Sequence, residues 1–382
     1  MPANLPAEAR AKWLKVMEAR TPEEKLRALQ EFLASVPRHK GTEKLVRQVR
    51  RQMALLRRDV ERRRAKRGGG RGLFVGKEGA AQVLMLGLPN SGKSTILSAL
   101  TNAKPLISDA PFTTKRPVAG MMEYEGIQLQ LVEAPAIVEG SADGARLGGV
   151  ALAMARNADA LMIVIDATYD PAYQLRVVEG ELGKTGVLIR RPKCLVTVER
   201  RGEGGVTVVG ELDGCTYRDV VELLSSYGLR HALVRIEGRA TLDDIEEAIH
   251  GAKVYKPAVV VVNKVELGGQ GAVEEVRGVA SDLPVLAFGA ERFAEELGRT
   301  LVRALGLIRV YTRDPSTKEV AKRPIVLRRG ATVADVARLV HSQLLEGFKY
   351  ARVWRKSFRV SPQRVGRDFV LEDGDVVEII AR

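Results

Sequence analysis

A glycine-rich loop at residues 87–95 carries residue types that bind phosphate. It fits the spacing GxxxxGK[ST] and stands between an apolar run and a helical-looking stretch. Glycines allow backbone N–H groups to approach phosphate oxygens, Lys93 supplies a positive charge for the β- and γ-phosphates, and the Ser94 hydroxyl is placed to bind Mg²⁺. A plain glycine turn is the alternative. The predicted nucleoside triphosphate site comprises Gly87, Leu88, Pro89, Asn90, Ser91, Gly92, Lys93, Ser94 and Thr95.

A second polar cluster, Asn263-Lys264-Val265-Glu266, directly follows an apolar run at residues 258–262. It resembles the NKxD motif with which GTPases recognise guanine. A carboxylate here can accept hydrogen bonds from the ring N–H and the exocyclic amine of guanine, a pair that adenine does not present. Glu266 is one methylene longer than the usual Asp, which weakens or shifts this contact. A strand-ending loop without a ligand is the alternative.

The elements that would position these residues form an α/β pattern. Short apolar runs alternate with helical stretches, as in a mainly parallel sheet whose ligands lie at the carboxyl ends of the strands. The 91 residues between two of these runs exceed one crossover helix and contain two further strand-like runs. We therefore expect a small α+β subdomain at about 182–256 inside the sheet domain. The sheet runs are QVLML, IQLQLV, ALMIVI, AVVVV and PVLA; those of the insertion are CLVTVE and VTVVG.

The two ends of the chain read as separate regions. Residues 1–70 are predicted as basic helices, with apolar residues recurring every three or four positions from Leu45 to Val60, until a run of glycines ends them. The sheet domain follows at 71–307. Residues 308–382 show alternating strands, a helix near 333–345 and a final strand pair around the turn at 372–375, which predicts a compact β-rich domain.

Charge is segregated along the chain, whose net charge is +14. Residues 1–72 hold 20 Lys and Arg against 8 Asp and Glu, and residues 308–382 hold 16 against 9, whereas the intervening segment is mildly acidic. Two basic ends suggest that a polyanion such as RNA is held there. A charged surface typical of thermophilic proteins is the alternative, and the N-terminal helices could equally present a solvated basic face.

Composition excludes several classes of protein. The chain is 45% hydrophobic, enough to form real cores. Cys194 and Cys215 form no CxxC pair and the four histidines are far apart, which excludes disulfide scaffolds and zinc fingers. No leader-like apolar segment opens the sequence and no apolar run is long enough to span a membrane. We expect a soluble cytoplasmic protein with no membrane partner.

The motifs together resemble the developmentally regulated GTP-binding (DRG) family, within the Obg-like P-loop GTPases. The resemblance covers nearly the whole chain. It implies an N-terminal helical region, a P-loop GTPase domain with an inserted α+β subdomain, and a C-terminal TGS domain of β-grasp fold. The stretches that carry it are GLPNSGKST, SDAPFTTKRPVAG, ALMIVIDAT, RRPKCLVTVE…GGVTVVGELDG, NKVE and IRVYTRDPSTKEVAKRPIVLRRGATVADVARLVHSQL…LEDGDVVEII.

The resemblance assigns roles to individual positions. It implies that Lys93 and the loop amides hold the phosphates of GTP or GDP, that Ser94 and Thr114 complete the Mg²⁺ shell, and that a potassium ion lies beside Asn90. Two alternatives come from the residues alone, since Thr114 could be a surface hydroxyl and Asn90 a turn former. The guanine would be held by Asn263, Lys264 and Glu266, with Gly289 and Ala290 in place of the family's Ser-Ala.

The segment at 133–136 departs from the family's DxPG, because it reads Glu133-Ala134-Pro135-Ala136. Glu133 can reach Mg²⁺ through water only with a rearranged side chain. Ala136 adds a Cβ, which is harmless at negative φ and strained in a left-handed conformation. Ile137 replaces the water-orienting Gln of many small GTPases, a change shared by the Obg group that implies slow intrinsic turnover or a different way of positioning the water, and not inactivity.

Two hypotheses follow for the function. In the first, the chain is a slow Mg²⁺-dependent GTPase, with Lys93, Thr114, Glu133 and Ala136 at the reaction centre. It would act as a switch in translation, contacting the ribosome or RNA through its basic helices and TGS domain, with a protein activator or stabiliser as a further partner. In the second, the altered motifs mark a degenerate G domain that binds nucleotide or RNA without hydrolysis. A metabolic kinase is disfavoured because no acceptor-substrate residues can be named.

Overall fold

The computed structural model describes residues 6–19, 22–37, 45–46, 49–50, 52–53, 56, 75–103, 117–144, 148–250 and 253–381. The chain divides into two compact units. One comprises Met1–Gly72 with Pro192–Val254, and the other Leu73–Arg191 with Tyr255–Arg382. No helix among the described residues is long and apolar enough to cross a membrane.

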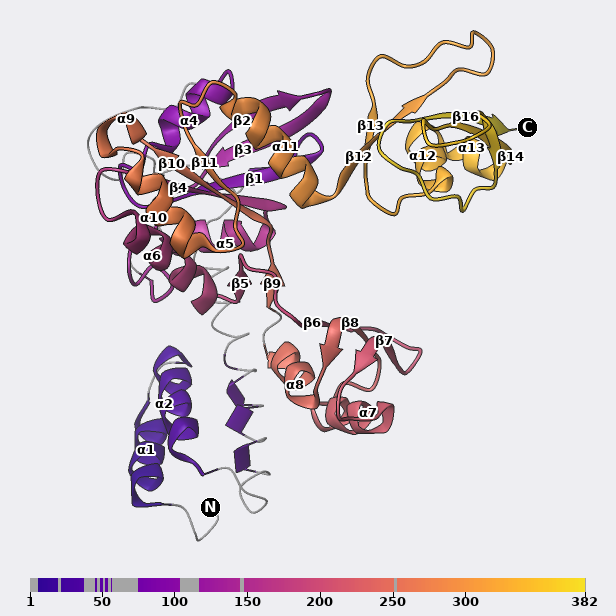
Figure 1. Ribbon diagram of the computed structural model, residues 1–382. Coiled ribbons are helices and arrows are strands. Elements are labelled where there is room, and N and C mark those ends of the chain that lie inside the picture. Colours follow the sequence, from indigo (N-terminus) through magenta and orange to yellow (C-terminus); the bar gives the residue numbers. More distant parts are fainter. Residues whose placement is uncertain are drawn as a thin grey trace. The chain divides into compact units, whose positions relative to one another are not determined.

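A six-stranded sheet forms the centre of the second unit, in the order β11-β10-β4-β1-β3-β2 (Figure 1). Its first five strands are parallel, and β2 is antiparallel to β3. The continuous apolar runs are completely buried in β1, β4 and β10, as expected for strands covered on both faces. The strands are β1 (Ala81–Leu86), β2 (Val118–Tyr124), β3 (Ile127–Glu133), β4 (Ala160–Asp166), β10 (Ala258–Asn263) and β11 (Val285–Ala287).

Helices cover both faces of this sheet (Figure 1). One face packs against α4 (Lys93–Leu100) and α11 (Phe293–Leu305), which contribute Ile96, Leu297 and Leu301 to the core. The other carries α5 (Gly148–Asn157), α6 (Pro171–Lys184) and α10 (Gly271–Ala280). The short helix α9 (Val265–Gly268) follows β10, and the pair β5 (Val187–Leu188) and β9 (Val254–Tyr255) flanks the inserted segment. The predicted α/β fold with a mainly parallel sheet is confirmed.

The TGS-like segment at the C-terminus is a five-stranded sheet in the order β13-β12-β16-β14-β15. Its central strands β12 and β16 are parallel, and α12 packs on one face through Val333, Val336 and Ala337. The elements are β12 (Leu307–Thr312), β13 (Ile325–Arg328), α12 (Val333–Val340), α13 (Ser342–Glu346), β14 (Phe348–Trp354), β15 (Gln363–Val365) and β16 (Asp375–Ala381).

The strand pair predicted around the turn at 372–375 is wrong in its pairing. After this turn, β16 pairs with β12 and β14, and before it only Val370 makes an isolated bridge, to Thr332. The reason is that β16 lies between β12 and β14, so neither of its edges is left for the segment before the turn. The turn itself is closed by the buried Asp375 side chain, which accepts a hydrogen bond from the Glu372 N–H at 2.8 Å and pairs with Arg355 at 2.7 Å.

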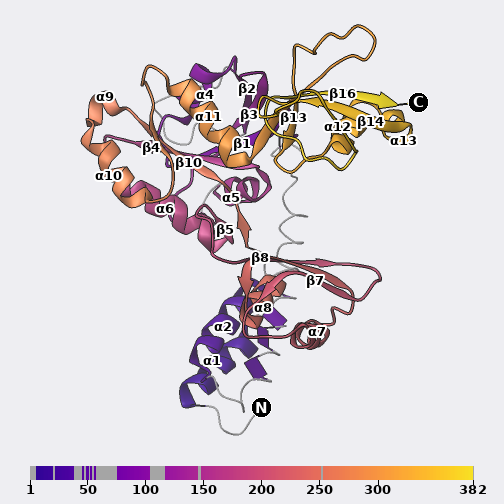
Figure 2. The same ribbon diagram turned by 45° about the vertical axis from the view of Figure 1, so that its right-hand side comes forward.

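The other unit joins the N-terminal helices to the inserted segment (Figure 2). Helices α1 (Ala7–Glu18) and α2 (Pro22–Ser35) pack through a small core in which the rings of Trp13 and Phe32 lie 4.9 Å apart. In the insertion, α7 and α8 pack on a sheet of order β6-β8-β7. Its elements are β6 (Leu195–Arg200), β7 (Val206–Leu212), α7 (Tyr217–Ser226), β8 (Ala232–Ala240) and α8 (Leu242–His250).

An ion pair connects the two segments of this unit. The Arg50 guanidinium lies 2.5 Å from the Glu246 carboxylate of α8. Val49 is buried and Leu45, Met53 and Leu56 pack beside it, as the predicted apolar stripe requires, whereas Val60 lies outside the described residues. Cys194 and Cys215 are free thiols whose pKa burial raises.

Candidate nucleotide site

The glycine-rich loop joins buried β1 to the first turn of α4, and two of its glycines have no room for a side chain. A Cβ on Gly87 would lie 2.4 Å from the Val164 carbonyl oxygen, and one on Gly92 would lie 1.9 Å from Asn263 Nδ2. Gly92 also has a φ of 85°, a left-handed conformation that favours glycine. The loop is thus held close to the ends of β4 and β10. Ser91 is buried, Leu88 and Pro89 are half-buried, and Thr95 is exposed.

Lys93 folds back over this loop. Its Nζ donates to the carbonyl oxygens of Gly87 at 3.2 Å and Leu88 at 2.9 Å. Burial lowers the pKa of the Lys93 ammonium to about 8, against the opposing effect of the Glu133 charge. The ammonium is therefore largely protonated at neutral pH, and its neutral acceptors are weaker than phosphate oxygens. This arrangement fits a phosphate-binding lysine.

Ser94 and Glu133 bring two oxygen atoms together beside the loop. The Ser94 hydroxyl donates to Glu133 Oε1 at 2.6 Å. Hydroxyl and carboxylate oxygens are suitable ligands for Mg²⁺, either directly or through water, so this pair fits the metal that accompanies a nucleoside triphosphate. Thr114, the other predicted Mg²⁺ ligand, lies outside the described residues, as does the whole range 104–116. The structure therefore brings together only part of the predicted metal shell.

The altered segment at 133–136 is accommodated without left-handed strain at Ala136. Six non-glycine residues in the described ranges have positive φ, and Ala136 is not one of them. The side chain of Ile137 is completely buried, and its N–H donates to the Gly87 carbonyl at 3.1 Å. Ile137 therefore belongs to the core at this position, and its backbone ties the segment to the glycine-rich loop.

The second polar cluster contacts the first loop directly. Asn263, the last residue of β10, donates from Nδ2 to the Ser91 carbonyl at 3.0 Å. Lys264 has a φ of 59° and donates from Nζ to the Asn90 carbonyl at 2.9 Å. Asn90 is also left-handed, with φ at 61°, which suits its predicted alternative as a turn former. The structure thus joins two motifs that are about 170 residues apart in the sequence.

Glu266 and the 289–290 loop complete the rim at the end of β10. Glu266 lies on α9 with its side chain exposed, and within the described ranges it makes no hydrogen bond or ion pair. Gly289 has a φ of 93°, and the preceding Phe288 donates its N–H to the Val262 carbonyl at 2.8 Å. This hydrogen bond sets Gly289 and the exposed Ala290 beside β10. The carboxylate is available to a ligand such as a base.

Asp166 and Gln174 belong to the site but were not predicted. Asp166 ends β4 opposite Asn263 and pairs with the Lys264 ammonium. Partial burial raises the pKa of Asp166, but hydrogen bonds from Lys264 and Thr168 outweigh it and hold that pKa below its usual value. The buried Gln174 accepts from the Asp166 N–H at 2.9 Å and donates to its carbonyl at 2.8 Å. The position of Asp166, an acidic residue at the end of an apolar run, was the signal in the sequence that could have identified it.

Glu181 of α6 holds the loop that follows residues 133–136. This buried carboxylate accepts hydrogen bonds from the N–H groups of Gly140 at 3.1 Å and Ala142 at 2.6 Å. Ser141 between them is buried, and its hydroxyl accepts from the Val138 N–H at 2.9 Å. The loop is therefore attached to the helix layer. No sequence signal distinguishes Glu181 from a solvent-facing helix residue.

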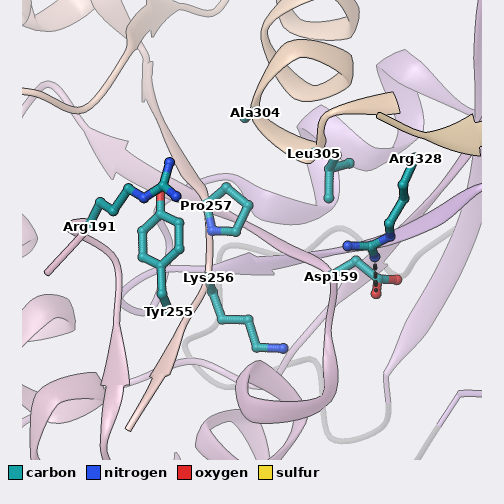
Figure 3. Close-up of a pocket in the computed structure, with 8 residues that line it drawn as sticks. All are labelled: Asp159, Arg191, Tyr255, Lys256, Pro257, Ala304, Leu305 and Arg328. Carbon is teal, nitrogen blue, oxygen red and sulfur yellow. Dashed lines mark hydrogen bonds and ion pairs between the residues drawn. The ribbon is translucent and has the colours of Figure 1, made fainter. Parts of the chain in front are cut away.

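A hollow of about 310 Å³ lies at the opposite edge of the sheet (Figure 3). Asp159 precedes β4 and Pro257 precedes β10, whereas the glycine-rich loop follows β1, so the hollow lies at the other ends of these strands from the candidate nucleotide site. Figure 3 shows the Arg328 guanidinium directed toward the Asp159 carboxylate. None of the predicted site residues lines this hollow. The lining residues are Asp159, Arg191, Tyr255, Lys256, Pro257, Ala304, Leu305 and Arg328.

Comparison with protein families matches most of the chain, in three consecutive segments. Residues 82–196 match the family described as 50S ribosome-binding GTPase, residues 203–307 match the C-terminal region of that domain, and residues 308–381 match the TGS domain.

Individual relatives extend over most of the chain. An uncharacterized GTP-binding protein of Methanocaldococcus jannaschii is 33% identical over 367 residues, which covers 94% of this chain and 93% of the relative. Developmentally-regulated GTP-binding protein 1 of Xenopus laevis is 30% identical over 358 residues, covering 92% and 96%. Among solved structures, a GTP binding protein from Pyrococcus horikoshii has a TM-score of 0.43 at 17% identity, covering 79% of this chain and all of that one.

Proposed function

Because the chain belongs to the developmentally regulated GTP-binding proteins, a family of P-loop GTPases with a TGS domain, we propose that it is a slow Mg²⁺-dependent GTPase acting as a switch in translation. The observation that carries this proposal is the contact between the two motifs. The glycine-rich loop presents Lys93 and Ser94 on one side and is held by Asn263 and Lys264 on the other. One ligand with a phosphate end and a base end fits this arrangement.

The chemistry of each side chain decides its proposed role in binding the nucleotide and Mg²⁺. Lys93 and the loop amides would hold the phosphates, Ser94, Thr114 and Glu133 would supply Mg²⁺ ligands or position its water, and Glu266 would accept from guanine. Bound Mg²⁺ would neutralise charge that develops on the phosphate oxygens during hydrolysis. The buried, hydrocarbon Ile137 cannot orient a water molecule, which supports a slow intrinsic rate. A potassium ion beside Asn90 stays part of the proposal.

The proposed partner is ribosomal RNA, and the proposed location is the cytoplasm, where ribosomes lie. The match to a family described as ribosome-binding and the two basic ends support this assignment. Phosphate contacts depend on charge, so reversing the charges of Arg62, Arg63, Arg64 and Lys66, which lie outside the described residues, should weaken RNA binding and reduce its salt dependence. Unchanged affinity and salt dependence would exclude the N-terminal contact. A stabilising or activating protein remains a proposed further partner.

The proposed activity is tested by titrating the full chain with labelled GTP, GDP and ATP, with and without Mg²⁺. Phosphate release is then followed in the same samples with potassium or sodium. Guanine-selective binding with slow, potassium-stimulated release is the expected result. Tight binding without release under any condition would favour the non-hydrolysing nucleotide-binding module, and loss of guanine preference would contradict the assignment of the base end.

Removal of the Glu266 carboxylate should abolish discrimination for the exocyclic amine of guanine. The wild-type chain should bind GDP more tightly than IDP, which lacks this amine, by about tenfold, the value of one hydrogen bond to a charged group. In Glu266→Ala the two affinities should become equal. Isothermal titration measures all four affinities, and Glu274→Ala, which removes an exposed carboxylate on α10, is the matched control. A GDP preference that survives in Glu266→Ala would place base recognition elsewhere.

A further inference from the structure

The β14 strand of the C-terminal domain presents two different faces. Ala351 and Val353 point into the core, where α12 packs. Because side chains alternate along a strand, Tyr350, Arg352 and Trp354 lie on the other face, and all three are half-buried. The rings of Tyr350 and Trp354 are four residues apart, a separation of about 13 Å along a strand, too far for one base to cover both.

An arginine guanidinium group lies over each of these two rings. The Arg364 guanidinium lies 4.0 Å from the centre of the Tyr350 ring, and the Arg313 guanidinium lies 4.6 Å from the centre of the Trp354 ring. Arg364 is exposed on β15, at the edge of the sheet, and Arg313 follows β12. These two contacts, called stacks below, place a positive charge over an aromatic ring at two places on one sheet.

A buried glutamate on the same sheet pairs with two further cations. Glu378 of β16 is completely buried and lies 2.8 Å from Lys318 Nζ and 3.3 Å from the Arg352 guanidinium. Burial raises the pKa of Glu378, but these two cations outweigh it and keep that pKa below its usual value. Glu378 therefore pairs with two cations, and Arg313 and Arg364 add two more over the rings. The face has a surplus of positive charge beside its rings.

From this arrangement we infer that the open face of the TGS sheet binds single-stranded RNA, with bases on the Tyr350–Arg364 and Trp354–Arg313 stacks and phosphates near Lys318 and Arg352. Every base has a flat face that stacks on aromatic rings or guanidinium planes, and the surplus charge complements the RNA backbone. Paired bases inside a duplex are hidden from such stacks. This inference rests on the RNA partner of the proposed function and names the form of RNA and the surface that takes it.

The inference is tested on the full chain by fluorescence anisotropy with a labelled single-stranded RNA oligonucleotide and with the same strand paired to its complement. Wild-type protein should bind the single strand more tightly than the duplex. Trp354→Ala with Tyr350→Ala should weaken single-strand binding by about tenfold or more, because each lost stack weakens binding by several-fold at least. Trp354→Phe with Tyr350→Phe keeps both rings and should retain most of the affinity.

An exposed substitution tests the same surface without removing the half-buried rings, whose loss could unfold the domain. Arg364→Gln removes one exposed guanidinium from a stack, whereas Arg367→Gln removes an equally exposed one that faces Asp368. Only Arg364→Gln should weaken single-strand binding beyond the general effect of one charge. The inference would be overturned if Arg364→Gln and Arg367→Gln weakened RNA binding equally, or if the wild type bound the single strand and the duplex with equal affinity. Either result would leave a charge-based RNA contact intact. A wild-type chain that binds no RNA in any nucleotide state would overturn the RNA partner itself.

Discussion

Lys93→Ala is expected to lower the affinity for GTP by about 100-fold or more while leaving the fold intact. The ammonium lies over the glycine-rich loop on two neutral carbonyl oxygens, which are weaker partners than the phosphate oxygens that would replace them. Hydrogen bonds to charged groups contribute about 1.5–3 kcal/mol each, so the loss of contacts to the β- and γ-phosphates accounts for the expected factor. Titration with a fluorescent, non-hydrolysable GTP analogue measures it.

Thermal unfolding separates this effect from structural damage. Burial of the Lys93 ammonium is unfavourable and is opposed by the charge of Glu133, so Lys93→Ala should unfold close to the wild-type temperature without nucleotide. The same GTP analogue should raise the melting temperature of the wild type by mass action and have little effect on the variant. Lys77→Ala, which removes a lysine that pairs with Asp159 at the opposite edge, should behave as wild type. Wild-type affinity in Lys93→Ala would show that phosphates bind elsewhere.

Continuous apolar runs were sufficient to predict the sheet and the edge of it at which the two polar motifs meet. The runs at β1, β4 and β10 are buried on both faces, and parallel strands place their carboxyl ends at one edge. The rule that ligands bind at this edge therefore brings Lys93 near Asn263 before any coordinates are known. The contacts of Asn263 and Lys264 with the loop agree with that expectation.

Residues on helix surfaces could not be predicted from the sequence. Glu181 and Gln174 look like ordinary polar positions of an amphipathic helix, and only the packing of α6 against the sheet gives them backbone partners. The contact between Arg50 and Glu246 also depends on tertiary packing, since it joins residues 196 positions apart in the sequence. The roles of the individual site residues, and the boundaries at 70 and 307, stay predictions.

Gly92→Ala should abolish nucleotide binding through two separate effects. The added Cβ would sit 1.9 Å from Asn263 Nδ2, and the φ of 85° is unfavourable for any residue with a Cβ. The strain alone costs about 1–2 kcal/mol. The clash adds to it by pushing the Asn263 amide off the Ser91 carbonyl, which disturbs the phosphate end and the base end together. Affinity for GDP and the melting temperature should both fall.

Two further variants distinguish strain from clash. Gly374 has a φ of 87°, but a Cβ there would have no heavy atom within 4 Å, so Gly374→Ala should show the strain alone, as a modest fall in melting temperature with normal GDP affinity. Adding Asn263→Ala to Gly92→Ala removes the clashing amide and should recover part of the lost stability, because residues in contact are coupled. If the double variant were as unstable as the two single changes added together, Asn263 would not be the atom group that requires glycine at position 92, and the loop would owe its conformation to backbone geometry alone.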